Sequence, residues 1–257
     1  MSIFSLVHTD AVKAALKEDL GHGRDITSEF LLDDGTNVTC VMNAREDGIL
    51  AGIELAEIAY NLVSDNTLKL TRHKNDGDAL KADDKILTIT GEAKLILSAE
   101  RIGLNYVSHL SAIATKTAEY VKAVEGTNAA IVCTRKTLPG LRTLQKHAVR
   151  MGGGKNHRFG LDDAILIKDN HIAAAGGITP VLDRAKDAGH MVKIEIEVNT
   201  LDQLDEVIAH GGADIVLLDN MPPTDLKEAV KRIQGKMISE ASGGVNMDTV
   251  RGIAESG

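Results

Sequence analysis

From residue 129 onward the sequence repeats one pattern, an apolar segment followed by a stretch with helical spacing. The apolar segments are AAIVCT, DAILIKD, VKIEIEV, ADIVLLD and MISEASGG, at residues 129–134, 163–169, 192–198, 213–219 and 237–244. TPVLDRAKDAG, LDQLDEVIAHGG and TDLKEAVKRIQG are the helical stretches between them. Strands joined by helices imply right-handed crossovers, so the pattern predicts a parallel sheet, either closed into a barrel or left open.

Residues that can bind ligands or react stand at the end of each predicted strand. They are Arg135 and Lys136, then Lys168, Asp169 and Asn170, then Glu197, then Asp219 and Asn220, and finally Ser242 and Gly243. In α/β barrels the active site lies at the carboxyl ends of the strands, so these side chains are expected to share one mouth. An open doubly wound sheet would favour a Gly-rich first turn, and MGGGKNH does not match that fingerprint. The barrel is therefore preferred.

Residues 1–110 follow a different pattern. TDAVKAALKEDLG has helical spacing, Asp25 suits a helix cap, and NVTCVMNA, TLKLTRH and KILTITG alternate as antiparallel strands do, with turn residues between them. Residues 93–126 show the apolar spacing of a long, partly buried helix. We expect an N-terminal α/β domain over 1–110 and a C-terminal barrel domain with the active site over 111–257.

Composition limits the class of protein. The 257 residues are 43% hydrophobic, and no apolar run approaches the roughly 20 residues of a membrane span. The opening MSIFSLVHTD lacks a secretory signal, and Cys40 and Cys133 lack metal-type spacing. We expect a soluble, cytoplasmic protein with no membrane partner.

The segment Thr134–Leu161 concentrates seven Lys or Arg and two His with no acid, in a chain of net charge −8. Part of it could be a solvated helix face, with Lys146 and Lys155 as surface charges. A nucleic-acid patch is disfavoured by three Tyr, three Phe and no Trp, and by the acidic balance. A concave site for a small anion fits better, because each charge pair at 4 Å contributes about 4 kcal/mol at an effective dielectric near 20.

Two acids belong to the same predicted mouth. Glu197 and Asp219 would repel a phosphate unless a cation lay between, and Mg²⁺ prefers a few carboxylates together with phosphates and water. This combination indicates diphosphate chemistry. For Glu197 a second interpretation stays open, since KIEIEV could be an alternating strand with one solvent face.

Several segments together carry a family resemblance. TRKTLPGLR, HAVRMGGGKNHRFGLDDAILIKDNHI, IEIEV, IVLLDN and EASGGV, in this order, resemble the quinolinate phosphoribosyltransferases, also called nicotinate-nucleotide pyrophosphorylases (carboxylating). EDLGHGRDITSEFL and SAERIGLNYVSHLSAIAT match as well, so the resemblance covers nearly the whole chain. Pyrophosphorylase-like proteins linked to molybdenum transport share TRKTLPG but depart from IKDNHI, so Lys168, Asp169 and Asn170 favour the quinolinate enzymes.

The resemblance implies an N-terminal open-faced α/β sandwich and a C-terminal incomplete, TIM-like α/β barrel. It implies conversion of quinolinate and 5-phosphoribosyl-1-diphosphate, with Mg²⁺, to nicotinate mononucleotide, diphosphate and CO₂ in de novo NAD biosynthesis. It also implies a homodimer or higher homo-oligomer with a shared active site. Because the family continues past the position of Gly257 into another strand, the barrel is expected to be truncated at its C-terminal end.

The resemblance also implies roles for the basic residues. Guanidinium groups bind carboxylates with two parallel hydrogen bonds, which suits a pyridine dicarboxylate. Arg135, Arg158 and the partner subunit's Arg101 are the implied carboxylate ligands, with His157 and Lys168 beside them. Arg142 is predicted to bind substrate, with pairing to an acid on a neighbouring helix as its alternative.

The phosphoribosyl donor has its own implied residues. Lys136 is expected to meet its phosphates, Glu197 and Asp219 to hold Mg²⁺ and the ribose hydroxyls, and Ser242 and Gly243 to bind the 5′-phosphate. With Lys168, the residues Lys136, Glu197 and Asp219 form the predicted catalytic set. No general base is assigned, because the chemistry asks mainly for positioning and charge stabilisation.

Overall fold

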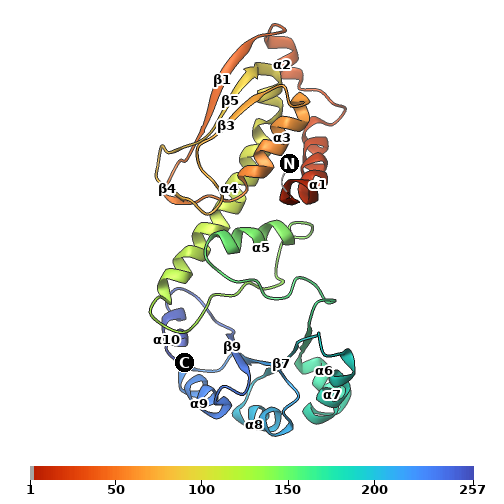
Figure 1. Ribbon diagram of the computed structural model, residues 1–257, viewed down its shortest axis with the longest axis vertical. Helices are drawn as coiled ribbons and strands as arrows, with labels where there is room; N and C mark the ends of the chain where they lie inside the picture. The colour runs from red at the N-terminus through yellow and green to blue at the C-terminus, as the bar shows by residue number, and fades with distance from the viewer. Residues whose placement is uncertain (1–2) are drawn as a thin grey trace. The chain divides into compact units, whose positions relative to one another are not determined.

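The computed structural model describes residues 3–257 and divides the chain into two compact units (Figure 1). Unit 1 comprises Met1–Glu119 and Thr137–Lys155, and unit 2 comprises Tyr120–Lys136 and Asn156–Gly257. Each unit brings together two segments separated in sequence. Segment 137–155, which lies after the predicted domain boundary at residue 110, is thus part of unit 1.

Unit 1 contains the predicted antiparallel sheet. Three strands pair in the order β1-β5-β3, and a short pair, β2-β4, lies apart from them. The strands are β1 (Asn37–Asn43), β2 (Gly48–Ile49), β3 (Lys69–Arg72), β4 (Ala79–Leu80) and β5 (Lys85–Glu92). The helices are α1 (Ile3–Leu20), α2 (Ile26–Leu31), α3 (Ile53–Ser64), α4 (Ala93–Ala123), whose last turn belongs to unit 2, and α5 (Arg142–Met151).

Helix α4 confirms the predicted long amphipathic helix. Its buried residues recur at spacings of three and four, among them Ile96, Ala99, Gly103, Val107 and Leu110. This stripe packs into one hydrophobic core with α1, α3 and the sheet. The predicted cap at Asp25 is also confirmed, since its side chain accepts a hydrogen bond from the Ser28 amide at 3.1 Å.

Helix α5 resolves the question of the two lysines. Leu144 and Ala148 join the unit 1 core, and Lys146 beside them is fully buried, with 0% of its surface exposed. The interpretation of Lys146 as solvated surface charge is therefore wrong, because α5 packs this side of the helix into the protein. Lys155, by contrast, is exposed.

Unit 2 contains a parallel sheet of four strands in the order β6-β7-β8-β9, as the strand-helix repeat predicts. The strands are β6 (Ile165–Ile167), β7 (Ile194–Val198), β8 (Ile215–Asp219) and β9 (Ile238–Ser242). The helices are α6 (Asp169–Ala175), α7 (Ile178–Ala185), the 3₁₀ turn η1 (Lys186–Ala188), α8 (Leu201–His210), α9 (Pro223–Ile233) and α10 (Val250–Ala254). Four sequential parallel strands with crossover helices match the predicted incomplete α/β barrel.

One predicted strand does not form. Segment 129–134 contains only an isolated bridge residue, Val132. A strand needs a neighbour that continues the hydrogen-bond ladder, and among the described residues the parallel sheet ends at β6 and β9. Ala129 and Ile131 pack instead on a small cluster formed by Val124, Val250 and Ala254. Within residues 3–257, no helix is both long and apolar enough to cross a membrane.

Asp76 organises the start of α3. Its carboxylate accepts the backbone N–H groups of Gly52 at 2.9 Å and Ile53 at 3.0 Å, and the Nε2 of His147 lies 2.7 Å away. Burial alone would raise the pKa of Asp76, but the hydrogen bonds from His147, Gly52 and Ile53 outweigh it and hold this pKa below the ordinary value. The charged carboxylate thus satisfies amide groups that the helix itself cannot pair.

We predict that Asp76→Ala lowers the free energy of unfolding by about 2 to 4 kcal/mol at neutral pH. The substitution removes the cap of α3 and leaves the half-buried His147 without its hydrogen bond to Asp76. Since the pKa is depressed in the folded state, the stabilisation is present at neutral pH and disappears as pH falls below about 4. Urea denaturation at pH 7 and pH 3 measures both effects.

Asp10→Ala serves as the control, because this carboxylate is 95% exposed and lies 3.5 Å from Lys13. Its expected effect is under about 0.5 kcal/mol. Equal stability of the Asp76→Ala and Asp10→Ala proteins at pH 7 would contradict the role given to Asp76.

Candidate functional site

The parallel sheet of unit 2 has one apolar and one charged face. Successive side chains of a strand point to opposite sides, so Ile196 and Val198 share one face of β7 while Glu195 and Glu197 share the other. Ile196 and Val198 are fully buried in a core that includes residues of α7, α8 and α9. Glu195 and Glu197 are only 3% and 9% exposed. The interpretation of this face as an ordinary solvent face is therefore wrong.

Strand register extends the charged face across the sheet. Glu197 is in register with Leu217 on β8, and Leu217 is in register with Glu240 on β9. Two residues further along β8, Asp219 pairs in register with Ser242. Because in-register residues of neighbouring strands point to the same side, all these polar side chains lie on one face. The convergence predicted at the carboxyl ends of the strands is thus present for Glu197, Asp219 and Ser242.

Lys168 joins this face from the end of β6. Ile167 is in register with Ile196, so the next residue, Lys168, stands beside Glu197, and its ammonium forms an ion pair with Glu197 Oε2. Lys168 is also the N-cap residue of α6, and its backbone N–H donates to His171 Nδ1 at 2.9 Å. The side chain of Lys168 is 47% exposed, against 11% for Glu197. The lysine therefore combines an anchored backbone with an accessible charge.

Asp219 is held from two sides at the end of β8. Ser242 Oγ donates to Asp219 Oδ1, and Asn220 Nδ2 donates to Oδ2 at 2.6 Å. The turn that follows β9 requires glycine at position 243, where φ is +86° and a Cβ would lie 2.0 Å from Asn220 Oδ1. Ser242 and Gly243 thus form a compact turn against Asp219, with the backbone carbonyl of Ser242 accepting the Asn220 N–H at 2.8 Å.

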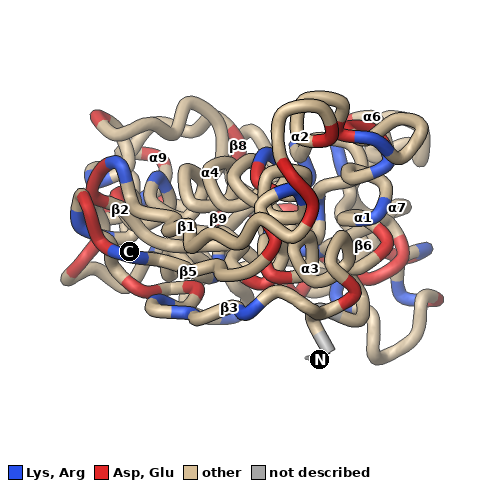
Figure 2. The backbone as a smooth tube through the Cα atoms, turned by 90° about the horizontal axis from the view of Figure 1, so that it is seen from above, with Lys and Arg blue, Asp and Glu red and all other residues tan. Residues whose placement is uncertain are grey.

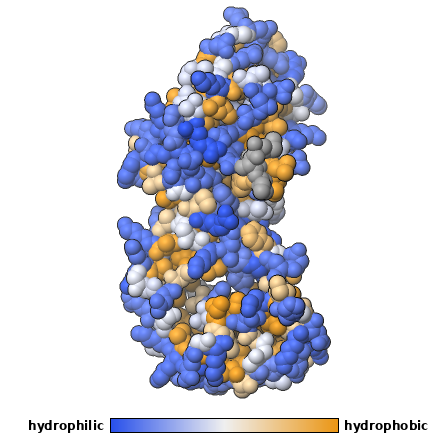
Figure 3. Space-filling model, in the orientation of Figure 1, coloured by the Kyte–Doolittle hydropathy of each residue, from blue (hydrophilic) through white to orange (hydrophobic). Residues whose placement is uncertain are grey.

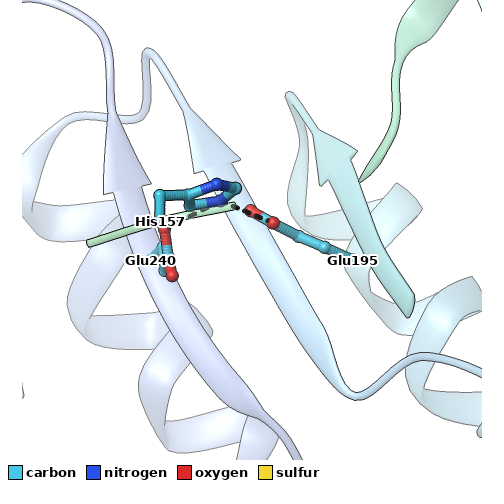
Figure 4. A group of neighbouring side chains, drawn as sticks. All are labelled: His157, Glu195 and Glu240. Carbon is cyan, nitrogen blue, oxygen red and sulfur yellow. Dashed lines mark hydrogen bonds and ion pairs between the residues drawn. The ribbon is translucent and has the colours of Figure 1, made fainter. Parts of the chain in front are cut away.

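A second group on the same face joins His157, Glu195 and Glu240 (Figure 4). His157 Nε2 lies 2.8 Å from Glu195 Oε2 and 3.8 Å from Glu240 Oε2. Burial raises the pKa of Glu195 to about 7, although the positive charges of Arg158 and Lys168 oppose the shift. Burial and the neighbouring Glu195 also raise the pKa of Glu240. The ligand atoms of the three side chains lie within 4.8 Å of one another, so two full negative charges on Glu195 and Glu240 are disfavoured.

Three further predicted residues lie in unit 2. Arg158 Nη1 donates to the Ala164 carbonyl at 2.7 Å, while its Nε is buried and has no hydrogen-bond partner within the described part of the chain. Arg135 is half-buried and Lys136 is exposed. The Lys136 backbone N–H donates to Thr134 Oγ1 at 3.0 Å, which fixes the backbone and leaves the ammonium accessible.

The other two predicted site residues lie in unit 1. Arg101 is exposed on α4, with its guanidinium 4.0 Å from Glu100, and it lines a cleft of about 930 Å³ formed by β1, β2 and α4. Arg142 is the first residue of α5, and its Nε donates to Thr137 Oγ1 at 3.1 Å. This contact of Arg142 is with a hydroxyl group.

Glu195 and Glu240 were not predicted as site residues. The signal for Glu195 was present, because its spacing of two from Glu197 places both side chains on the same face of a strand. Glu240 gave no such signal, since only the pairing of β9 with β8 reveals that it shares the row of Glu197. The charged face therefore carries two more acidic side chains, Glu195 and Glu240, than the residues at the strand ends predicted.

Comparison with known proteins agrees with this geometry. Two family models match, "Quinolinate phosphoribosyl transferase, N-terminal domain" over residues 25–111 and "Quinolinate phosphoribosyl transferase, C-terminal domain" over residues 113–257. The probable nicotinate-nucleotide pyrophosphorylase [carboxylating] of Bacillus subtilis (strain 168) is 43% identical over 234 residues, 91% of this chain and 80% of the relative. The nicotinate-nucleotide pyrophosphorylase [carboxylating] of Mycobacterium leprae (strain TN) is 42% identical over 252 residues, 96% of this chain and 88% of the relative.

Solved structures give the same answer for the fold. NadC from Streptococcus pyogenes matches with a TM-score of 0.91 and 36% identity, over 97% of this chain and 89% of that one. The nicotinate-nucleotide pyrophosphorylase from Francisella tularensis matches with a TM-score of 0.92 and 39% identity, over 97% of this chain and 87% of that one. Sequence, fold and charged sheet face agree, and the chain belongs to the quinolinate phosphoribosyltransferase family.

Proposed function

We propose that the protein transfers the phosphoribosyl group of 5-phosphoribosyl-1-diphosphate to quinolinate, giving nicotinate mononucleotide, diphosphate and CO₂ on the de novo route to NAD. One observation carries the proposal: the charged face of the β6–β9 sheet gathers Lys168, Glu197, Asp219 and Ser242 in a member of this family. The molybdenum-linked alternative is not favoured, because the family models and the named relatives all belong to the quinolinate enzymes.

Quinolinate carries two adjacent carboxylates on a planar ring. Arg158 supports binding of such a ligand, because its buried Nε–H has no partner among the described residues and a carboxylate oxygen would satisfy it. Arg135 and Lys168 supply further positive charge in the proposed arrangement, with His157 beside Arg158. The Lys168 side chain stays accessible while it is paired with Glu197. Its ammonium group can therefore bind a substrate anion and still balance part of the negative charge of Glu197.

The phosphoribosyl donor is assigned to the other end of the charged face. The exposed Lys136 is proposed to bind its phosphates, and the Ser242-Gly243 turn its 5′-phosphate. Backbone N–H groups in a tight, glycine-containing turn are suitable phosphate donors, which supports this assignment. Asp219 is held by hydrogen bonds from Ser242 and Asn220. In the proposed arrangement it accepts hydrogen bonds from the ribose hydroxyls with little further loss of side-chain entropy.

The donor set also suits Mg²⁺. Glu197 and Asp219 offer only oxygen ligands from adjacent strands, and Mg²⁺ is held by one or two carboxylates, with substrate phosphates and water completing its shell. Glu197 and Asp219 would hold the ion, which when bound would neutralise charge on the departing diphosphate. Lys168 beside Glu197 limits the local negative charge, so a phosphorylated substrate is not repelled.

The remaining chemistry asks the protein for positioning and charge. The pyridine nitrogen attacks the ribose carbon as the bond to diphosphate breaks, and Lys136 stabilises the negative charge on the leaving group. The ring nitrogen is then positive and accepts the electron pair left when the adjacent carboxylate departs as CO₂. A proton finally replaces that carboxylate on the ring. Arg135 and Arg158 contribute by holding the ring in the attacking orientation.

We predict that Lys136→Ala and Arg158→Ala each lower kcat/KM at least about 100-fold, because each removes a charge-assisted contact to an anionic substrate. The Arg158 change should act mainly on quinolinate and the Lys136 change mainly on the phosphoribosyl donor. Steady-state formation of nicotinate mononucleotide with each substrate varied in turn separates the two. Lys186→Ala, a surface change on unit 2, is the control, and wild-type rates in all three proteins would contradict the assignment.

We also propose a homodimer, or a larger homo-oligomer, whose active sites are shared between subunits. This proposal is supported by Arg101, which is exposed and lines a cleft of about 930 Å³ within unit 1. The cleft is an exposed surface that a second subunit could contact. The cleft also carries charged side chains of both signs, including Arg45, Glu46 and Lys116. Charges of both signs in a concave surface can pair with complementary charges on a partner subunit, which supports specific association.

The shared site predicts complementation between two inactive variants. Arg101→Ala and Lys136→Ala proteins should each be nearly inactive, yet mixing and reassociating them should restore about a quarter of wild-type activity if random dimers form with one intact site in each hybrid. The readout is nicotinate mononucleotide formation before and after subunit exchange. Absence of any recovery, with exchange confirmed by mass spectrometry of tagged subunits, would contradict sharing.

Location and other partners remain predictions. A reducing compartment such as the cytoplasm is supported by Cys40 and Cys133, since neither forms a disulfide bond within the described part of the chain. Nucleic acid stays disfavoured, because acidic and basic residues are interspersed along the backbone in Figure 2. The face drawn in Figure 3 is largely hydrophilic, with apolar residues in small separate groups, which fits the predicted absence of a membrane partner.

A further inference from the structure

We propose that Glu195 is a positioning residue for the dicarboxylate substrate, acting through His157 on Arg158. The carboxylate of Glu195 accepts the Nε2–H of His157, and the other ring nitrogen of His157 accepts the backbone N–H of Arg158. The inference rests on the proposed function, because it concerns how Arg158 is presented to quinolinate. Glu195, a buried residue of β7, thereby supports the residues that are proposed to contact quinolinate.

The hydrogen bonds of His157 with Glu195 and with the Arg158 amide define its tautomer. The Arg158 N–H can only donate, and it lies 2.8 Å from Nδ1, so Nδ1 carries a lone pair. The proton of the neutral ring is then on Nε2, which lies 2.8 Å from Glu195 Oε2. Glu240 Oε2, at 3.8 Å, is beyond hydrogen-bonding distance. Glu195 is therefore the acceptor that fixes the ring.

The same tautomer opposes metal binding by the cluster of His157, Glu195 and Glu240. We interpret this cluster as a hydrogen-bonded group that positions Arg158. A metal on Nε2 would move the ring proton to Nδ1, where it would face the N–H of Arg158. Two donors would then point at each other. The three ligand-type groups in Figure 4 are close together, yet the backbone amide opposes metal binding by the histidine.

Glu195 is a rigid anchor because its strand is paired on both sides. It is in register with Leu166 on β6 and with Ile215 on β8, and only 3% of its surface is exposed. Loss of side-chain freedom has thus occurred on folding and is not required again when substrate binds. A hydrogen bond from such a residue orients its partner better than one from a mobile loop.

Arg158 is held at both ends as a result. Its backbone is tied to His157, and its Nη1 is tied to the Ala164 carbonyl at 2.7 Å. Its buried Nε–H points to no acceptor among the described residues. This combination fixes the guanidinium while leaving one donor for a ligand carboxylate. Releasing the His157 end would let the guanidinium turn away from that orientation.

The test compares Glu195→Ala with Glu195→Gln. Glu195→Ala removes the acceptor, and we expect the KM for quinolinate to rise about tenfold or more while the KM for the phosphoribosyl donor changes less than about twofold. Glu195→Gln keeps an acceptor oxygen in place and should stay within about threefold of wild type. Glu228→Ala, which removes a glutamate paired with Arg232 on α9, is the matched control.

The pair of variants separates positioning from charge. At pH 8, where a carboxyl group with a pKa of about 7 is mostly ionised, both variants remove negative charge near Arg158 and Lys168, so a purely electrostatic role predicts tighter quinolinate binding in both. Weaker binding in Glu195→Ala together with near-normal binding in Glu195→Gln supports positioning. Tighter binding in both variants, or no change in Glu195→Ala, overturns it.

A measurement on the wild-type protein keeps the test independent of variant folding. Nitrogen-15 NMR of the imidazole side chains, with the His157 signals assigned by their loss in His157→Gln, should show a neutral ring protonated at Nε2. A ring protonated at Nδ1 overturns the inference even if Glu195→Ala fails to fold. A wild-type enzyme that makes no nicotinate mononucleotide, with this tautomer present, instead refutes the proposed function.

Discussion

The charged face of unit 2, on which the proposed reaction rests, depends on side-chain alternation in one short parallel sheet. On β7, Ile196 and Val198 are buried under the helices, so Glu195 and Glu197 must occupy the opposite face. Slippage of one residue would place glutamates in an apolar core at a cost of several kcal/mol per charge. The hydrophobic face therefore fixes the register, and the register in turn places Lys168, Asp219 and Ser242.

The charged face of the β6–β9 sheet attracts anions through its basic side chains, and it stabilises its own carboxylates by ion pairs and hydrogen bonds. Lys168 compensates Glu197, while Asp219 is stabilised by hydrogen bonds from Ser242 and Asn220. Glu195 lies deeper, where burial raises its pKa to about 7 and where it holds His157. Acids close to the proposed ligands are thus neutralised or hydrogen-bonded. Cations can then act on a dicarboxylate or a diphosphate without competing repulsion.

Sequence alone predicted much of this, and its limits have physical causes. Periodicity identified four strands of the parallel sheet and the long helix α4, because burial on one face leaves a clear pattern. It failed at 129–134, where the apolar run joins no sheet among the residues that the structure describes, and at Lys146, whose burial depends on how α5 packs. Glu240 was missed because its relation to Glu197 arises only through pairing of β7, β8 and β9.

The central claim is tested most directly by the stoichiometry of the reaction. Purified protein, quinolinate, 5-phosphoribosyl-1-diphosphate and Mg²⁺ are incubated, and nicotinate mononucleotide, diphosphate and CO₂ are quantified together. The account predicts equal amounts of the three products, none without quinolinate, and none after the metal is chelated. Diphosphate released without nicotinate mononucleotide, or no product from folded protein, would contradict it.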